Sequence, residues 1–325
     1  MPSHDQLVVR PARREDLPVL AELQTAAHAA DGIERAGSVA WLEHALAHPR
    51  GLPTASILLV AERAGLRIGF VESGYFQEPS GLHVLRTRGH VHSMARMQGV
   101  GTALLTAATG RLESWATTRA LRGPAVLSAW HYQQEVGAEA LLSRFGYQLQ
   151  RRMLEMTRDL KQPVPEPPAL PHGVDTRPAR QEHLPAIWHA FTASAQEDTG
   201  SFLANDAQYR AWCDLPSTQL KRWQIAWAGD QVVALVLSHV ESARPQLGSA
   251  DDVHVTPAWR RRGLGRTLLL ESLAQLQRDG CTSALLDVNE ENAAARALYK
   301  DLGYAPRRVI EVRRKRLDLS GASNP

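Results

Sequence analysis

The stretch Arg260-Arg261-Arg262-Gly263-Leu264-Gly265-Arg266 places two glycines in a cluster of arginines, between segments of different periodicity. Before it, residues 253–257 alternate β-branched and polar side chains and end in a proline, which predicts a strand. After it, leucines recur at helical spacing as far as Gly280, which predicts a helix. The unit is therefore a strand, a basic glycine turn and a helix.

The chemistry of this turn points to a phosphate. Gly263 and Gly265 permit positive φ and a close approach of the backbone. Successive N–H groups then converge on an anion at the positive end of the following helix, and the arginines add charge for a phosphate. Gly-x-Gly alone is common in turns that bind nothing, but the strand, the proline and the amphipathic helix make the pattern more specific. It is neither a Walker loop nor a dinucleotide fingerprint, because Gly-Lys-Ser/Thr is missing and an arginine opens it.

The pattern Val255-x-Pro257-x-x-Arg260-x-x-Gly263-x-Gly265-x-x-Leu268-Leu269 resembles the acetyl-CoA motif of the GNAT superfamily of N-acetyltransferases. The resemblance implies that amides of the turn hold the diphosphate of acetyl-CoA, and that the pantetheine arm pairs with the strand before it. It also implies that the N–H of Val255 polarises the thioester carbonyl. The cofactor residues in this stretch are then Val253, His254, Val255, Arg260, Arg261, Arg262, Gly263, Leu264, Gly265 and Arg266.

The bulk properties exclude several other classes of protein. The 325 residues carry a net charge of only +3, which gives no case for a nucleic-acid partner. No apolar run approaches the ~20 residues needed to span a bilayer, and the stretch 1–14 lacks the apolar core of a signal peptide. Two cysteines, Cys213 and Cys281, fit a reducing compartment. We therefore expect a cytoplasmic protein without a membrane partner.

The chain contains an internal duplication. Residues 10–18 recur as residues 177–185, both with Arg-Pro-Ala-Arg, a glutamate and Leu-Pro. A predicted β-hairpin over 56–71 recurs over 223–237, with Gly-Asp as the second turn. The glycine turn itself has a second copy, Arg96-Met97-Gln98-Gly99-Val100-Gly101-Thr102. The fold class is therefore α/β, with two tandem GNAT-like domains, each a mixed, mostly antiparallel sheet flanked by helices.

A proline-rich segment separates the two copies. Residues 161–171 are predicted to be a stiff, extended linker, because proline fixes φ and cannot donate to a ladder. The predicted domains are an N-terminal one over 1–160 and a catalytic one over 172–319, with a frayed tail over 320–325. By the same resemblance, the cofactor residues of the first domain are Val91, Arg96, Gln98, Gly99, Val100, Gly101 and Thr102.

A second signature follows the basic turn. Asn292 is predicted to be the N-cap of a helix that carries Tyr299 two turns on. Asn292, then Ala-x-x-Leu-Tyr, then Gly303-Tyr304 resembles the corresponding GNAT segment, which implies that Asn292 contacts CoA and Tyr299 is the general acid. A tyrosine with a pKa near ~10 can protonate a thiolate whose conjugate acid has a pKa near ~8.5. The alternative for Tyr299 is an aromatic side chain packed against the sheet.

The general base is left open between two acids, Asp252 and Asp287, and a water chain. Asp252 and His254 lie two apart on the predicted strand and share a face, whereas Asp251 points the other way. Asp287 lies where several GNAT enzymes carry a glutamate. Other GNAT enzymes use a glutamate early on the strand before the glycine turn. That position falls near Ser249 in this sequence, where no glutamate is present. The alternative for each acid is a solvated or salt-bridged side chain.

The first half lacks the second signature. Counting back from Gly146, Leu142 takes the position of the tyrosine and Glu135 that of the asparagine, where a carboxylate repels an anionic cofactor. We therefore predict a degenerate first domain. His90 and His92 share a strand face, but without a third ligand they predict no metal.

The sequence thus predicts an N-acetyltransferase in which a primary amine, on a small molecule or a peptide, attacks acetyl-CoA directly in the second domain of a monomer or homodimer. The tandem layout is also similar to that of mycothiol synthases, so acetylation of an amino-thiol pseudodisaccharide is an alternative. A non-catalytic CoA-binding sensor or scaffold is the alternative from another class. The acceptor pocket is expected among the helices near residues 186–215.

Overall fold

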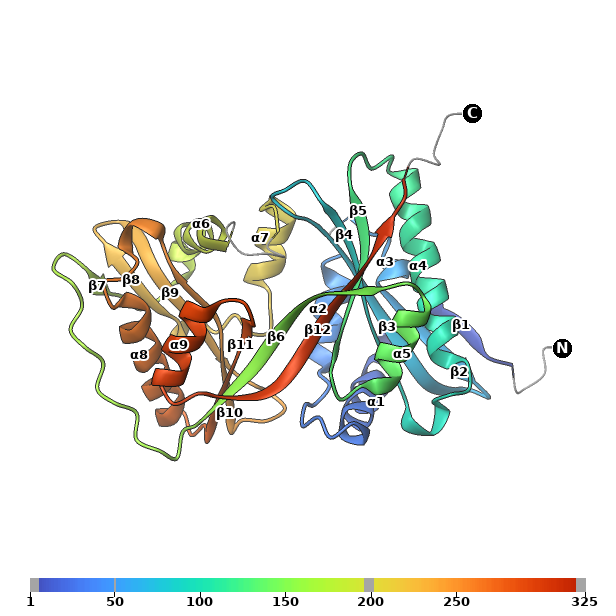
Figure 1. Ribbon diagram of the computed structural model, residues 1–325, viewed down its shortest axis with the longest axis horizontal. Helices are drawn as coiled ribbons and strands as arrows, with labels where there is room; N and C mark the ends of the chain where they lie inside the picture. Colours follow the sequence, from blue (N-terminus) through green and yellow to red (C-terminus); the bar gives the residue numbers. More distant parts are fainter. Residues whose placement is uncertain (1–5, 50, 196–201, 320–325) are drawn as a thin grey trace. The chain divides into compact units, whose positions relative to one another are not determined.

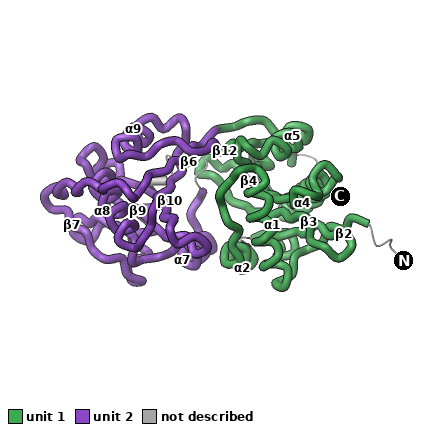
Figure 2. Tube along the Cα trace, turned by 90° about the horizontal axis from the view of Figure 1, so that it is seen from below, with its two compact units in different colours: residues 1–151, 310–325 green, residues 152–309 purple. Residues whose placement is uncertain are grey.

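The computed structural model describes residues 6–49, 51–195 and 202–319. Its contacts divide the chain into two units, residues 1–151 with 310–325 and residues 152–309, which Figure 2 colours separately. The predicted tail over 320–325 lies outside the described residues. Each unit contains one copy of the glycine turn, and each is described below by itself.

The strands of the first unit are neighbours in the sheet in the order β1-β2-β3-β4-β5-β12. Neighbouring strands are antiparallel except β4 and β5, which are parallel. The strands are β1 (Val8–Pro11), β2 (Leu58–Arg63), β3 (Leu66–Gln77), β4 (His83–Val91), β5 (Ala125–Tyr132) and β12 (Ala305–Leu317). The helices are α1 (Leu17–Ala30), α2 (Val39–Ala47), α3 (Thr54–Ile57), α4 (Val100–Thr118) and α5 (Val136–Arg144) (Figure 1).

Helices pack on both faces of this sheet, so β2 is buried on both sides. Successive side chains of a strand point to opposite faces. Along β2, Leu58 and Val60 pack in a cluster with residues of α1, whereas Leu59 and Ala61 pack with residues of α4. The run of consecutive apolar residues is therefore explained by a central strand between two helical layers.

The second unit repeats this plan with the order β6-β11-β10-β9-β8-β7. Here β10 and β11 form the parallel pair, and the other recorded pairs are antiparallel. The strands are β6 (Gln148–Asp159), β7 (Asp175–Thr176), β8 (Gln224–Ala228), β9 (Gln231–Val240), β10 (Leu247–Val255) and β11 (Ser283–Asn289). The helices are α6 (Leu184–Ala195), α7 (Asp206–Cys213), α8 (Leu264–Arg278) and α9 (Ala293–Asp301). The mixed α/β class and the hairpin turn at Gly229-Asp230 are confirmed.

The two halves of the sequence exchange their last strands. Strand β5 pairs with residues 310–317 of β12, which the sequence repeat assigns to the second half. In turn β11 pairs with residues 153–159 of β6, from the first half. Each unit is therefore completed by a strand that is distant in sequence. The predicted boundaries follow the sequence repeat, whereas the units follow the sheets.

The segment between the copies has no regular secondary structure over 163–171. Two of its side chains, Val164 and Leu170, pack against the core of the second unit. Among the helices in the described ranges, none combines the length and the apolar character that a bilayer crossing requires.

Candidate active site

The glycine turn of the second unit joins the end of β10 to the start of α8. Arg261 has φ of 61° and Gly263 has φ of 85°, so two residues of the turn are in the left-handed region. Glycine at 263 adopts this conformation without the strain that a side chain brings. Leu264 opens the helix with its side chain in the core, at 1% exposure, which fixes the register of the turn against α8.

The first unit has the same backbone in its own turn. Met97 has φ of 59° and Gly99 has φ of 80°, in the places of Arg261 and Gly263. In both units the opening arginine is structural. Nε of Arg96 donates to the carbonyl of Val91 at 3.4 Å, and Nε of Arg260 donates to that of Val255 at 3.1 Å. The turn is thus tied back to its strand in both copies.

Both helices that follow a glycine turn begin without a side-chain cap. The N-caps of α4 and α8 are Gly99 and Gly263, which have no side chain to accept from the first turn. By contrast, Asn205 caps α7 and Asn292 caps α9. The first N–H groups of an α-helix have no acceptor within the helix. The start of α8 therefore offers an anion both amides and the positive end of the helix dipole.

The other arginines of the basic turn differ in their partners. The guanidinium of Arg262 lies 4.8 Å from the centroid of the Trp259 ring. Nη2 of Arg266 lies 3.2 Å from Oδ2 of Asp301 in α9. Arg261 is exposed beside the start of the helix. Arg260, Arg262 and Arg266 thus have contacts within the protein, and Arg260, Arg261 and Arg262 are all exposed beside the amides of α8.

Strands β10 and β11 diverge next to this turn. Their parallel pairing covers only Leu247–Ser249 and 283–285, although β10 continues to Val255. A β-bulge lies at the point of divergence, between Ala250 and Asp252 in the register with β9. Bulges re-aim side chains and end pairing. The edge of β10 over Val253–Val255, where the resemblance places the pantetheine arm, therefore faces the gap between the two strands.

Helix α9 packs beside the start of α8 (Figure 1). A Cβ built at Gly265 would meet Leu298 at 3.8 Å and Val255 at 3.5 Å, which is ordinary contact. The predicted N-cap is confirmed, since Oδ1 of Asn292 accepts from the N–H of Ala295 at 3.1 Å. Tyr299, next to Leu298, is 7% exposed and belongs to the core cluster. Tyr299 therefore lies on a helix, α9, that packs against the glycine turn.

The two candidate bases lie on the diverging parts of β10 and β11. Asp252 shares a face with His254 as predicted, with Oδ1 of Asp252 3.8 Å from Nε2 of His254. Asp287 is exposed on β11, opposite Glu155 of β6 in the register. Neither contact decides between the two acids, and both roles stay predictions.

A third acid, Asp251, has partners that sequence reasoning missed. Its Oδ2 lies 3.1 Å from Nδ1 of His239 on β9, and the hydroxyl of Ser249 donates to its Oδ1. Nε2 of His239 lies 3.8 Å from Glu241. The bulge at Asp251 makes this pairing possible. No local pattern in the sequence links His239 to Asp251, because the contact depends on the register between β9 and β10.

We expect His239 to make stability depend on pH. Burial disfavours its charged form, but the Asp251 and Glu241 carboxylates outweigh this and raise the pKa of His239 from 6.5 to about 9. Because the folded pKa is the higher one, this stabilisation is complete below about pH 6.5 and is lost as the pH rises through about 9. The free energy of unfolding should therefore fall more steeply between these pH values in the wild type than in His239→Asn. Equal slopes in urea titrations would contradict the assignment.

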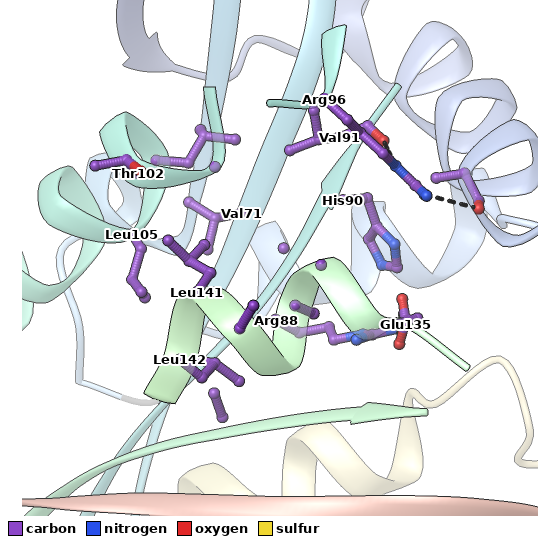
Figure 3. Close-up of a pocket in the computed structure, with 18 of the residues that line it drawn as sticks. Val71, Arg88, His90, Val91, Arg96, Thr102, Leu105, Glu135, Leu141 and Leu142 are labelled. Carbon is purple, nitrogen blue, oxygen red and sulfur yellow. Dashed lines mark hydrogen bonds and ion pairs between the residues drawn. The ribbon is translucent and has the colours of Figure 1, made fainter. Parts of the chain in front are cut away.

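The larger described cavity lies in the first unit, not beside Tyr299. It measures about 650 Å³ and occupies the place between β4, β5, α4 and α5 that matches the diverging strands of the second unit (Figure 3). Five of the predicted cofactor residues line it, namely Val91, Arg96, Gly99, Gly101 and Thr102. Leu142, in the position of the tyrosine, lines it as well. The cavity of the first unit is therefore lined by predicted cofactor residues but has no phenol at the position of the tyrosine.

Two polar side chains of the first glycine turn are already engaged within the protein. Nη1 of Arg96 lies 2.7 Å from Oδ1 of Asp31. The Gln98 amide accepts from Arg63 at 2.6 Å and donates to the carbonyl of Met94 at 2.8 Å. Val100 is buried in the core, at 1% exposure. For these residues only the backbone is available to a phosphate.

A second cavity, of about 480 Å³, borders the basic turn in the second unit. It is lined by residues of α6, of the turn between β8 and β9, and of the segment 256–259. Its polar side chains include His189, Asp230, Gln231 and Thr256. This covers part of the region in which the acceptor pocket is expected. Residues 196–201 of that region lie outside the described residues.

Comparison with known proteins identifies the family. The model of the acetyltransferase (GNAT) family matches residues 185–304, within the second unit. A mycothiol acetyltransferase of Salinispora tropica is 31% identical over 305 residues, which cover 90% of this chain and 92% of that protein. The chain belongs to the GNAT family of acetyltransferases. A mycothiol acetyltransferase of Geodermatophilus obscurus is 32% identical over 232 residues, 67% of this chain and 69% of that protein.

Solved structures show the same GNAT fold along the whole chain. A tandem GNAT protein from the clavulanic acid biosynthesis pathway has a TM-score of 0.72 at 17% identity, covering 98% of this chain and 100% of that one. A GCN5-related N-acetyltransferase from Sphaerobacter thermophilus has a TM-score of 0.71 at 22% identity, covering 97% and 96%. The predicted tandem GNAT architecture is confirmed, and the chain is an acyltransferase.

Proposed function

We propose that the second unit transfers the acetyl group of acetyl-CoA to a primary amine by direct attack. The observation that carries this proposal is the uncapped start of α8, placed between the divergence of β10 from β11 and the helix of Tyr299. The amides from Arg261 to Arg266 bind the diphosphate, with the exposed guanidinium of Arg261 beside them.

The residues of this chain divide the reaction between them. The edge of β10 over Val253–Val255 pairs with the pantetheine arm, and the N–H of Val255 polarises the thioester carbonyl. Asp252 or Asp287, directly or through water, takes the proton of the amine. Tyr299 gives its proton to the departing thiolate of CoA. The new amide bond forms as the carbon–sulfur bond breaks, and the free thiol of CoA leaves.

The acceptor is best sought among amino-thiol sugars. Relatives that align along nine tenths of this chain carry the name mycothiol acetyltransferase, so an amino-thiol pseudodisaccharide is the first substrate to test. The alternatives are other small amines and peptide N-termini. The acceptor binds on the side of the turn that α6 and the cavity of about 480 Å³ border.

The decisive experiment measures thiol release from acetyl-CoA by the full chain with a panel of amines. The panel holds an amino-thiol pseudodisaccharide, simple amino sugars, polyamines and peptides. Amine-dependent release, with the acetylated product detected by mass spectrometry, supports the proposal and ranks the acceptors. Binding of CoA without turnover of any amine would instead favour the non-catalytic sensor.

The first unit is proposed to bind without catalysing. Its cavity and its uncapped α4 match the cofactor site of the second unit, but Leu142 replaces the phenol and Glu135 replaces the asparagine. Such a site holds a ligand without supplying a proton to its leaving group.

A further inference from the structure

Two histidines and a glutamate meet at the cavity of the first unit. His28 comes from α1, His90 from β4 and Glu135 from the N-cap position of α5. One ligand atom of each lies within 4.8 Å of those of the other two, and all three residues are buried. Figure 3 shows His90 and Glu135 beside each other, with Arg88 next to the carboxylate. Sequence analysis paired His90 with His92, which is not part of this group.

Two imidazole nitrogens in this group lack partners. Within the described part of the chain, Nε2 of His28 and Nδ1 of His90 are buried and make no hydrogen bond. Both residues are 4% exposed. An unpaired polar atom in the interior costs about 1–3 kcal/mol, so native proteins rarely keep one without a use. Two such nitrogens in one cluster point to a missing ligand.

Each histidine has an outer contact that can set its tautomer. Nδ1 of His28 lies 3.1 Å from the carbonyl of Arg35, which fixes the proton there and leaves Nε2 with its lone pair. Nε2 of His90 lies 3.3 Å from the amide nitrogen of Gln24. Turning this amide by 180° exchanges its nitrogen and oxygen, so that the oxygen accepts the Nε2 proton of His90 and Nδ1 keeps its lone pair.

The burial of the two histidines and the charges around Glu135 also bear on metal binding. Burial disfavours the charged form of both imidazoles, and it lowers the pKa of His28 and lowers that of His90 well below its usual range. The carboxylate of Glu135 lies 2.8 Å from Nη2 of Arg88 and accepts from the N–H of Tyr132 at 2.7 Å. Arg88 opposes a cation by its charge, but it also orients the carboxylate.

We propose that His28, His90 and Glu135 form a binding site for a divalent transition-metal ion of the zinc class in the first unit. Two imidazoles and one carboxylate are a ligand set that zinc uses when one position stays open. His90 and Glu135 also line the cavity, so the open position faces it. A tetrahedral ion needs ligand atoms roughly 3.4 Å apart, so binding draws the three side chains together.

The test titrates the full chain, freed of metal by a chelator, with Zn²⁺ alone and with Co²⁺ alone. We expect one equivalent of each to bind in the micromolar range or tighter, and Co²⁺ to give the visible bands of a low-symmetry, tetrahedral-like site. Zn²⁺ should also raise the melting temperature, because it binds the folded chain.

Variants assign the ligands. Glu135→Gln, which keeps the size of the side chain, and His90→Ala should each weaken Zn²⁺ binding by at least about 100-fold. His92→Ala is the matched control, from the residue two positions along, and should bind as the wild type does. If His90→Ala does not fold, the affinity of Glu135→Gln for Zn²⁺ alone tests the assignment of the site. The absence of saturable binding in the wild type, or equal binding by Glu135→Gln, would overturn the site.

Discussion

Tyr299→Phe should lower kcat by about 10² to 10⁴, the usual contribution of a general acid, while the dissociation constant of CoA stays nearly unchanged. The phenol is proposed to protonate the departing thiolate, and phenylalanine keeps the packing of the ring in the core of the second unit. Steady-state rates of thiol release, together with CoA binding by calorimetry, measure the two effects separately. A kcat within twofold of the wild type would remove Tyr299 from the mechanism.

Tyr304→Phe is the matched control. The rings of Tyr299 and Tyr304 have their centroids 6.0 Å apart, and Tyr304 is buried in the same cluster, at 2% exposure against 7% for Tyr299. Among the described residues its hydroxyl has no hydrogen-bond partner. Removing it should therefore leave kcat unchanged and cost no stability, because phenylalanine leaves no buried polar atom unpaired. A large loss in both variants would indicate damage to packing rather than loss of an acid.

Arg313→Ala should destabilise the first unit by about 3–5 kcal/mol, as expected when one partner of a buried charge network is removed. Arg313 lies on the exchanged strand β12 and is 10% exposed at its side chain. Its guanidinium reaches Glu311 at 2.7 Å, Glu139 at 2.8 Å and His131 at 3.0 Å. Without it, the buried carboxylate of Glu311 loses its closest counter-charge.

Urea unfolding and amide hydrogen exchange measure this effect and locate it. The amides of β5, which pair with β12, should lose protection although the substitution is near the end of the sequence. Arg316→Ala, on the same strand but exposed, is the control and should change the free energy of unfolding by less than about 0.5 kcal/mol. Equal effects of the two variants would show that the network of Arg313 is not what holds the strand.

Local signals predicted much of the site. The glycine turns, the helices after them, both hairpins and the cap at Asn292 depend on residues close together in sequence, and each has a steric or hydrogen-bonding signature. The duplication supplied a second copy of each of these patterns, which supports the same prediction. The turns therefore agree with expectation down to the positive φ of Gly263, and the tandem arrangement follows from the repeat.

What the sequence did not reveal depends on distant pairing. The contact of His239 with Asp251 requires the bulge in β10, and no local pattern shows an extra residue in a ladder. His28 joins His90 only because α1 covers the sheet beside β4. The exchange of β6 and β12 could not be predicted either. The two strands are copies of each other in the repeat, so their sequence patterns do not show which of them pairs with β5 and which with β11.

The exchanged strand has a consequence for synthesis on the ribosome. Tyr132, at the end of β5, pairs with Ile310, so β5 finds its partner only after about 180 further residues have been translated. At typical elongation rates this delay is on the order of ten seconds or more. During that interval β5 has an open edge, which makes nascent chains candidates for chaperone binding, and stalled translation products should aggregate through that edge.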